Sequence, residues 1–168
     1  MISDPNQCSS IEGVCLLFAD GDWIESKDQS DEGIRLIQTG NVGNGVYIDK
    51  GERARYISSY TFDRLHCTEV KPGDILISRL PDPVGRACMI PEGLGKTITA
   101  VDCCIVRLGE AVLPEFFVAY TLTPLYASQV ELGITGSTRQ RISRKNLGQV
   151  VIPVSYTHLR AHETELHL

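Results

Sequence analysis

The part of the chain richest in functional chemistry runs from Thr135 to Pro153 and has the sequence TGSTRQRISRKNLGQVVIP. Four basic side chains fall within seven positions there, and they belong to Arg139, Arg141, Arg144 and Lys145. Side chains that both donate and accept hydrogen bonds alternate with them, namely Ser137, Thr138, Gln140, Ser143 and Asn146. Cationic groups neutralise phosphates, and amide, hydroxyl and guanidinium groups can also bind base edges. This composition is suited to a polyanion with distinguishable edges, as duplex DNA is.

The same segment has a predictable local structure. Gly136, between two hydroxyl residues, indicates a tight turn that presents the side chains after it. Ser143 is expected to cap a short helical turn formed by residues 144–147. A solvated basic loop followed by a capped helix would have this composition too, so the residues alone leave both interpretations open.

Four stretches of the sequence carry a resemblance to a known family. They are GIRLIQTGNVGNGVYID (33–49), VKPGDILISRLPDPVGRACMIPEG (70–93), PEFFVAYTLTPLYASQ (114–129) and TGSTRQRISRKNLGQVVIPV (135–154). In this order they resemble a target recognition domain from the specificity subunit of a type I restriction-modification system. The resemblance covers nearly the whole chain up to Val154, and it implies an α/β (α+β) fold with a curved, mixed, irregular β-sheet and a few flanking helices.

The resemblance also implies a function. In that family the domain recognises one half of a bipartite site in double-stranded DNA, and the subunit brings a methyltransferase (modification) subunit and an endonuclease (restriction) subunit to it. The methyltransferase then flips and methylates an adenine. The chain itself is therefore expected to be a non-catalytic specificity subunit, or a fragment of one, without a cofactor.

The expected DNA contacts come from two sources. The chemistry of the basic segment places Arg139 and Arg141 at base edges or phosphates, Gln140 at a base edge, and Arg144 and Lys145 at phosphates. The same segment adds its turn residues Gly136, Ser137 and Thr138. The resemblance adds Thr39 and Asn41 from a glycine-rich turn, and Arg79 and Arg86 on either side of the Pro81-Asp82-Pro83 loop.

Length and charge limit the number of domains and the kinds of partner that the chain can have. The chain has 168 residues with 42% hydrophobic content, which is enough for one core, so residues 1–154 are expected to form a single recognition domain. The net charge of −5 is unusual for a DNA-binding protein. Residues 1–34 hold eight acids against Lys27, a net −7, so the remainder carries +2. The acidic part could face away from DNA, face a protein partner or be a solvated surface.

Several other classes of protein are disfavoured. The six cysteines form no CxxC pair, which argues against a zinc site. GLGKT (93–97) lacks the first glycine of a phosphate-binding loop, because Ile90 occupies that position. Asp82 is not followed by the acid-x-Lys of a nuclease, and Asp82-Pro83-Val84 is not a methyltransferase target-base loop. No stretch is long enough to span a bilayer, and the N-terminus lacks a secretory signal, so we expect a cytoplasmic protein.

The last stretch, residues 155–168, departs from the family and is expected to be a non-native or truncated tail. His158 and His162 are spaced to bind a metal on one helical face, beside Glu163, but a read-through tail is the preferred interpretation. Two other functions remain open. The chain could be a protein-interaction scaffold that does not bind DNA, or the recognition fragment of a single-chain restriction-methylation enzyme.

Hydrophobic spacing and breakers predict the elements that must position these residues. Helices are expected at 9–18, 58–67 and 114–130. Strands are expected at 34–38, 46–48, 51–58, 74–80, 86–90 and 97–108, with the first two joined by a hairpin turn and 51–58 at a sheet edge.

Overall fold

The structure is a computed structural model that describes residues 7–154. Its strands are β1 (Cys8–Ser10), β2 (Cys15–Asp20), β3 (Gln29–Ser30), β4 (Ile34–Ile37), β5 (Arg55–Ile57), β6 (Ile75–Ser78), β7 (Ala87–Met89), β8 (Thr97–Thr99), β9 (Cys103–Leu108), β10 (Ile134–Thr135), β11 (Arg141–Ile142) and β12 (Val151–Pro153). Its α-helices are α1 (Ser59–Arg64), α2 (Pro114–Thr121), α3 (Pro124–Gly133) and α4 (Arg144–Gly148). Single 3₁₀ turns lie at Glu12–Val14, Ser26–Asp28, Thr39–Asn41 and Gly51–Arg53. The tail and the hypothetical His158–His162 metal site lie outside the described residues.

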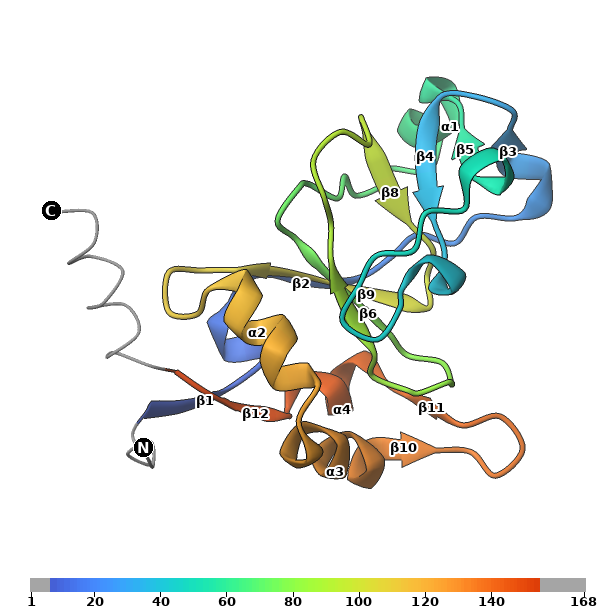
Figure 1. Ribbon diagram of the computed structural model, residues 1–168. Coiled ribbons are helices and arrows are strands. Elements are labelled where there is room, and N and C mark those ends of the chain that lie inside the picture. Colours follow the sequence, from blue (N-terminus) through green and yellow to red (C-terminus); the bar gives the residue numbers. More distant parts are fainter. Residues whose placement is uncertain (1–6, 155–168) are drawn as a thin grey trace, which may run out of the picture.

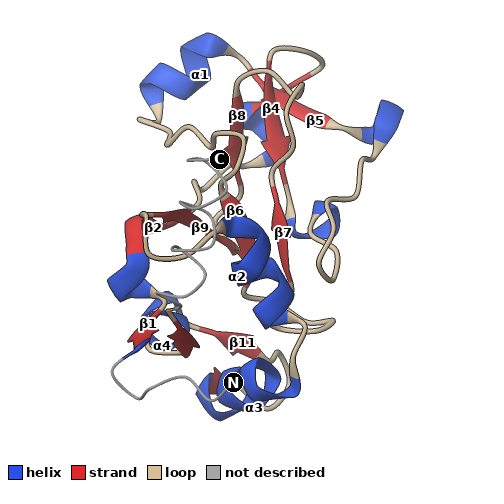
Figure 2. Ribbon diagram, turned by 60° about the vertical axis from the view of Figure 1, so that its left-hand side comes forward, coloured by secondary structure: helices blue, strands red, loops and turns tan. Residues whose placement is uncertain are grey.

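Two four-stranded sheets form the body of the molecule (Figure 1). One, of order β2-β9-β6-β7, is antiparallel throughout. The other, β3-β5-β4-β8, is mixed because β4 and β8 run parallel. The mixed sheet and α1 lie at one end of the molecule, and α3, α4 and the β10–β11 pair lie at the opposite end (Figures 1 and 2). This arrangement of several open sheets and four α-helices confirms the expected mixed α/β (α+β) fold class.

Strand β6 is the centre of the antiparallel sheet, and both of its faces are buried. Ile75 and Ile77 pack into the cluster that includes Phe117 of α2 and Tyr126 of α3. Leu76 faces the other way, into a cluster with Ile105 of β9. The register of β6 is set by pairing on both sides, with Ile75 opposite Met89 of β7 and opposite Val106 of β9, so the residue that follows β6 has a fixed position.

Three of the six cysteines are buried, whereas Cys8 is exposed and Cys15 and Cys67 are partly buried. Cys88, Cys103 and Cys104 are fully buried on β7 and β9. Burial raises the pKa of the Cys88 thiol to about 12 and that of Cys103 to about 11. None of the helices within residues 7–154 has the length and apolar character needed to cross a bilayer.

Several predicted elements are confirmed. The helix after Ser58 is α1, and the Ser58 hydroxyl accepts the N–H of Thr61 as its N-cap. The strands expected at 34–38, 74–80 and 86–90 are present as the shorter β4, β6 and β7. The capped turn after Ser143 is α4, where the Ser143 hydroxyl accepts the N–H of Asn146. The two serine caps depend on residues a few positions apart.

Other predictions are wrong, because pairing between distant strands overrides local periodicity. Residues 9–18 form β1, a 3₁₀ turn and the start of β2 rather than a helix, since β1 pairs with β12 and β2 pairs with β9. Residues 97–108 form two strands in different sheets, separated by the turn at 100–102. Strand β5 lies between β3 and β4 and is not an edge. The expected strand at 46–48 contributes only an isolated bridge between Val42 and Tyr47.

The helix predicted at 114–130 is two helices. Pro124 disfavours helical geometry at Thr123, which is extended at φ −91°, ψ 153°, and Pro124 also lacks the N–H that a continuous helix needs. The Thr123 hydroxyl accepts the N–H of Tyr126, so α3 begins with its own cap. The break places Tyr126 in the core, where its hydroxyl donates to the Gly85 carbonyl at 2.8 Å.

This buried hydrogen bond joins α3 to the loop before β7, and its loss is measurable. We expect Tyr126→Phe to lower the free energy of unfolding by about 1 kcal/mol, because the Gly85 carbonyl loses its buried donor. Urea denaturation measures the change, with Tyr60→Phe as the control, since Tyr60 is exposed on α1. Equal stability of the two variants would contradict the role given to the hydroxyl.

Candidate nucleic-acid interface

The basic segment begins with a β-hairpin that stands out from the body (Figure 1). Ile134 pairs with Ile142 and Thr135 with Arg141, and residues 136–140 form the connecting loop. Gly136 has a φ of +91°, and a Cβ there would lie 2.4 Å from the Arg139 carbonyl oxygen. The turn therefore requires glycine, which confirms the tight turn predicted at this position.

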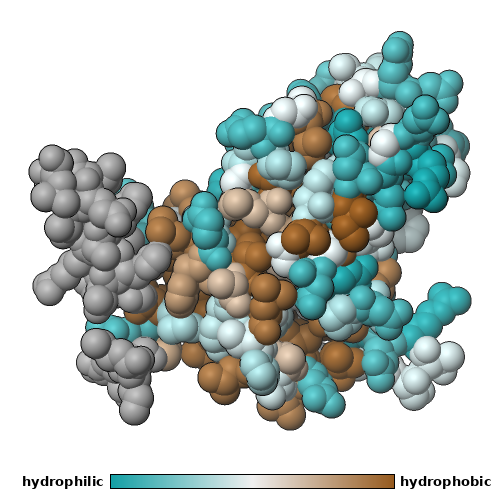
Figure 3. Space-filling model, in the orientation of Figure 1, coloured by the Kyte–Doolittle hydropathy of each residue, from teal (hydrophilic) through white to brown (hydrophobic). Residues whose placement is uncertain are grey.

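The side chains of the hairpin loop point into solvent. Every residue from Thr135 to Arg141 is exposed, whereas Ile142 is fully buried and anchors the base of the hairpin. In the space-filling view the loop is a polar protrusion at the lower right (Figure 3). The structure thus brings Ser137, Thr138, Arg139, Gln140 and Arg141 together on one projecting element.

Helix α4 follows the hairpin directly and extends the same basic surface. Arg144 and Lys145, in its first turn, are both exposed. The Nε of Arg144 lies 3.2 Å from Oδ2 of Asp20, at the end of β2. Arg141 makes a comparable ion pair at 3.4 Å with Asp102, in the turn before β9. We define the recognition surface as residues 136–141 together with Arg144 and Lys145.

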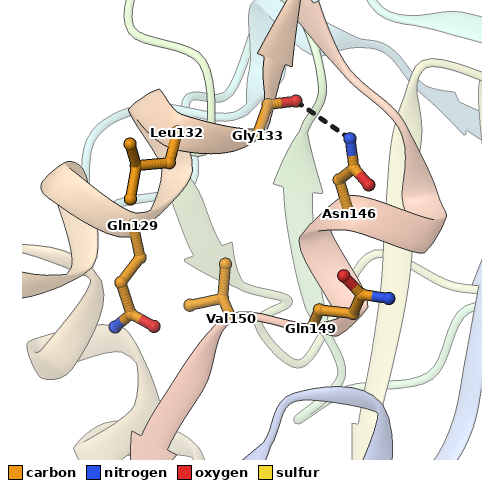
Figure 4. Close-up of a pocket in the computed structure, with 6 residues that line it drawn as sticks. All are labelled: Gln129, Leu132, Gly133, Asn146, Gln149 and Val150. Atoms are coloured by element: carbon orange, nitrogen blue, oxygen red, sulfur yellow. Dashed lines mark hydrogen bonds between the residues drawn. The ribbon is translucent and has the colours of Figure 1, made fainter.

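A small pocket joins α4 to α3 behind this surface (Figure 4). It has a volume of ≈ 270 Å³ and is lined by Gln129, Leu132, Gly133, Asn146, Gln149 and Val150. The Asn146 side-chain amide donates to the Gly133 carbonyl at 3.2 Å. A Cβ on Gly133 would lie 3.0 Å from Cδ1 of Ile142, so the end of α3 packs closely on the base of the hairpin. The lining is neutral, and we assign the pocket to packing rather than to chemistry.

Arg79 is not on the surface, which corrects its expected role as a DNA-facing residue. Its side chain is only 8% exposed. One guanidinium nitrogen donates to the Val101 carbonyl at 3.0 Å, and the group faces the carboxylates of Asp20 at 3.3 Å and Asp102 at 3.6 Å. Nε lies within ion-pair distance of Asp20 but lacks hydrogen-bond geometry, so the attraction there is mainly electrostatic.

The backbone of Arg79 also holds the hairpin in place. Its N–H donates to the carbonyl of Asp102 at 2.9 Å, and its carbonyl accepts the N–H of Ile142 at 3.1 Å. The residue after β6 is therefore bonded both to the turn before β9 and to β11. The position of the recognition surface depends on this anchor.

Arg86 and Asn41 also bond to the protein itself: Asn41 is buried, which corrects its expected DNA contact, whereas Arg86 is partly exposed and its DNA contact stays a prediction. The Arg86 guanidinium donates to backbone carbonyls of two loops, those of Val42 (2.6 Å), Thr39 (3.0 Å), Leu80 (3.0 Å), Pro81 (2.8 Å) and Pro83 (3.3 Å). Asn41 is buried; its side chain accepts the Gln38 N–H and donates to the Ile48 carbonyl. Thr39 is half-buried, and its carbonyl is one of the Arg86 acceptors. These residues hold the 39–45 and 80–86 loops against each other.

A groove runs beside the hairpin. It has a volume of ≈ 560 Å³, and its walls are the loop at Pro81–Val84, helix α3 and the hairpin residues Gly136 and Gln140. Asp82 and Glu131 also line it, so the groove carries acidic side chains. Among residues 7–154 no group of His, Cys, Asp and Glu side chains is arranged to hold a metal ion.

Sequence reasoning did not identify Asp20 and Asp102 as part of this region. Asp20 lies 124 residues before Arg144, and Asp102 lies 39 residues before Arg141. Nothing in the local sequence around either acid indicates its partner. Only the pairing of β2 and β6 with β9 brings them to the base of the hairpin.

Comparisons with known proteins identify the fold. No protein-family model and no curated protein matches the chain. Among solved structures, it is similar to a chain from a study of complex assembly and conformational transition of the type I R-M system, with 19% identity, a TM-score of 0.64 and coverage of 99% of this chain and 39% of that one. It is also similar to the HsdS subunit from Thermoanaerobacter tengcongensis, with 17% identity, a TM-score of 0.65 and coverage of 99% and 38%.

A third similar structure is the type I restriction-modification S subunit from M. genitalium, with 12% identity, a TM-score of 0.56 and coverage of 99% and 40%. At these identities the likeness is one of fold. The chain therefore has the fold of part of an S subunit, as the sequence resemblance predicted, and spans about two fifths of the length of the solved chains it matches.

The anchor at Arg79 can be tested without DNA. We expect Arg79→Met to lower the free energy of unfolding by about 3 kcal/mol, because it leaves the Asp20 and Asp102 carboxylates and the Val101 carbonyl without their shared cation. Chemical denaturation measures the loss. Arg139→Met is the matched control and should be nearly neutral, since Arg139 is exposed in the loop. A loss no larger than that of the control would show that the hairpin does not depend on Arg79.

Proposed function

We propose that this chain is a sequence-specific double-stranded DNA-binding domain that recognises one half of a bipartite site, as part of the specificity subunit of a type I restriction-modification complex. The observation that carries the proposal is the recognition surface. It presents Arg139, Gln140 and Arg141 on a projecting hairpin with Arg144 and Lys145 beside them, on a fold shared with solved S subunits.

The geometry suggests how the contacts divide. A two-stranded ribbon fits the major groove of B-DNA, where base pairs are distinguishable. The hairpin loop would enter that groove, with Gln140 bonding adenine and an arginine bonding guanine, each through two parallel hydrogen bonds. Arg144 and Lys145, on the helix behind the loop, would contact the phosphate backbone. Ser137 and Thr138 supply hydroxyls to either, and Gly136 maintains the turn.

The rest of the complex follows from the resemblance. One domain of this kind would bind one half-site, and a methyltransferase subunit and an endonuclease subunit would be its protein partners in the cytoplasm. The chain would itself be non-catalytic, with the partner methyltransferase modifying the adenine. Support for multi-subunit assembly comes from the solved chain described for complex assembly of a type I R-M system.

A protein-interaction role without DNA is the alternative, and one observation favours it. Leu125 and Leu132 on α3 are 69% and 89% exposed, and Val151 of β12 is also exposed. Apolar side chains this exposed are typical of surfaces that bind another protein. The two roles are compatible, because Leu125, Leu132 and Val151 do not belong to the recognition surface.

Selection from a randomised duplex pool tests the proposal. The whole chain is incubated with the pool at low and at physiological salt, and the bound DNA is sequenced. We expect one short motif that persists at the higher salt, because base contacts add to the salt-sensitive phosphate contribution. Absence of any motif, with no binding even at low salt, would rule out DNA recognition by this chain and leave the scaffold role.

Single substitutions on the recognition surface should separate the two kinds of contact. Gln140→Ala should relax the preference at one base pair by about 1–3 kcal/mol. Arg139→Ala and Arg141→Ala should each relax the preference at one base pair in the same way, if the arginine bonds a base. Lys145→Ala should weaken all sequences alike and reduce the salt slope by about one. Binding assays on the selected and a random duplex measure both effects.

The control for these variants is Lys71→Ala. Lys71 is exposed and precedes β6, at the opposite end of that strand from Arg79, so the variant has the same change of charge as Lys145→Ala away from the hairpin. The triple variant, with Arg139, Gln140 and Arg141 all replaced by Ala, gives the decisive result. If it keeps the affinity and the sequence preference of the unaltered chain, the hairpin does not recognise DNA.

A further inference from the structure

Five charged side chains alternate in sign at the base of the hairpin. In spatial order they are Arg144, Asp20, Arg79, Asp102 and Arg141, and every neighbouring pair lies between 3.2 and 3.6 Å apart. The central arginine is buried, the two acids are about one-third exposed, and the outer arginines are about half exposed. The row thus leads from the interior to the two arginines of the recognition surface that flank Ile142.

Each acid pairs with both the buried arginine and one surface arginine. Asp20 uses Oδ1 for Arg79 Nε at 3.3 Å and for the Cys104 thiol at 3.6 Å, which leaves Oδ2 for Arg144. Asp102 uses Oδ1 for both Arg79, at 3.6 Å, and Arg141, at 3.4 Å. Because Arg79 is held by backbone carbonyls on two other segments, neither carboxylate can turn freely.

This arrangement differs from an isolated surface ion pair. An exposed pair contributes little, since two long flexible side chains must be held in one geometry. Here one partner of each outer pair is already fixed by the buried arginine, so Arg141 and Arg144 lose freedom before any ligand arrives. Side chains that are ordered in advance bind with a smaller entropic cost, but only a ligand that matches their geometry benefits.

The acids have a second effect on a polyanion. They place two negative charges within contact distance of the arginines that would meet DNA. In a non-specific complex, a phosphate that approaches Arg141 must compete with the Asp102 carboxylate and is repelled by it. In the matched complex, an arginine that bonds a neutral base edge can keep its carboxylate partner, so the cost there is smaller. A cost that falls mainly on the non-specific complex increases discrimination.

We propose that Asp20 and Asp102 are positioning residues that set the sequence discrimination of this domain, by holding Arg144 and Arg141 in place and by opposing non-specific phosphate contacts. The inference rests on the proposed DNA-binding function and goes beyond it by assigning selectivity to two acids. It also accounts for acids lying directly behind a surface meant for a polyanion.

Asp102→Asn is the informative variant, because it removes the charge and keeps the shape. Affinity for a random duplex should rise about two- to tenfold, since one repulsive charge near the phosphates is lost. Affinity for the selected half-site should rise less, so the ratio between the two should fall. Asp102→Glu should restore the ratio at least in part. Asp31→Asn is the matched control, an exposed acid in the β3–β4 loop at the far end of the molecule.

A second measurement needs no DNA. Trypsin cleaves after Arg139 and Arg141, and its rate at these bonds reports how firmly the hairpin is held. We expect Asp102→Asn to be cleaved several-fold faster there than the unaltered chain, and Asp31→Asn at the unaltered rate. A change of net charge alone would not move this rate.

The outcomes separate the inference from the proposed function. If the unaltered chain does not bind DNA, the proposed function is wrong, and so is the role of the acids in discrimination. The trypsin rates would still show whether Asp102 positions the hairpin. Suppose that the unaltered chain binds its half-site specifically, and that Asp102→Asn raises the affinity for the random and the selected duplex by the same factor, as Asp31→Asn does. The inference would then be overturned, and the proposed function would stand. A trypsin rate unaffected by Asp102→Asn would overturn the positioning role.

Discussion

The interaction on which the rest of the structure depends is the burial of the Arg79 guanidinium between two carboxylates. A cation removed from water must be paired and hydrogen-bonded. Arg79 finds its partners on three segments that are far apart in the chain: the end of β2, the turn before β9 and strand β11. Because β6 is packed on both faces and paired on both sides, Arg79, which follows it directly, has a fixed position. The hairpin is bonded to the same residue, so the rigidity of the core reaches the recognition surface.

The other polar residues near the loops follow a related rule. Segments without regular structure carry backbone carbonyls that need donors. Arg86 supplies donors to five such carbonyls, and the buried Asn41 side chain closes the turn at 38–48. A basic or amide residue in a glycine- and proline-rich loop can therefore either bond to carbonyls within the protein or face solvent, and the sequence does not distinguish the two. Here Arg86 and Asn41, of the loops at 80–86 and 39–45, bond within the protein, whereas the cations of the hairpin and α4 are exposed.

The acidity of the N-terminal third now has a partly structural explanation. Asp28 accepts the Glu25 N–H and pairs with Arg64 at 2.7 Å, and these contacts hold the pKa of its carboxyl below the usual range. Asp22 accepts the Thr68 N–H, although burial raises its pKa. Asp20 pairs with arginines. Several of these acids thus join distant segments, while Glu12, Glu25, Asp31 and Glu32 remain exposed. A net charge of −5 is compatible with a basic recognition surface, because several of the acids are engaged in contacts within the protein.

What the sequence determined by itself was local. The Ser143 cap, the glycine turn at Gly136, helix α1 with its Ser58 cap and the exposure of the basic loop all follow from residues within a few positions of one another. Tertiary structure decided the rest. It turned the segment predicted as a helix at 9–18 into strands, divided 97–108 between two sheets, buried Arg79, and brought Asp20 and Asp102 to Arg144 and Arg141 across 124 and 39 residues. Periodicity records which residues a strand or helix buries, but the identity of the partner across a sheet depends on chain topology, which no local pattern contains.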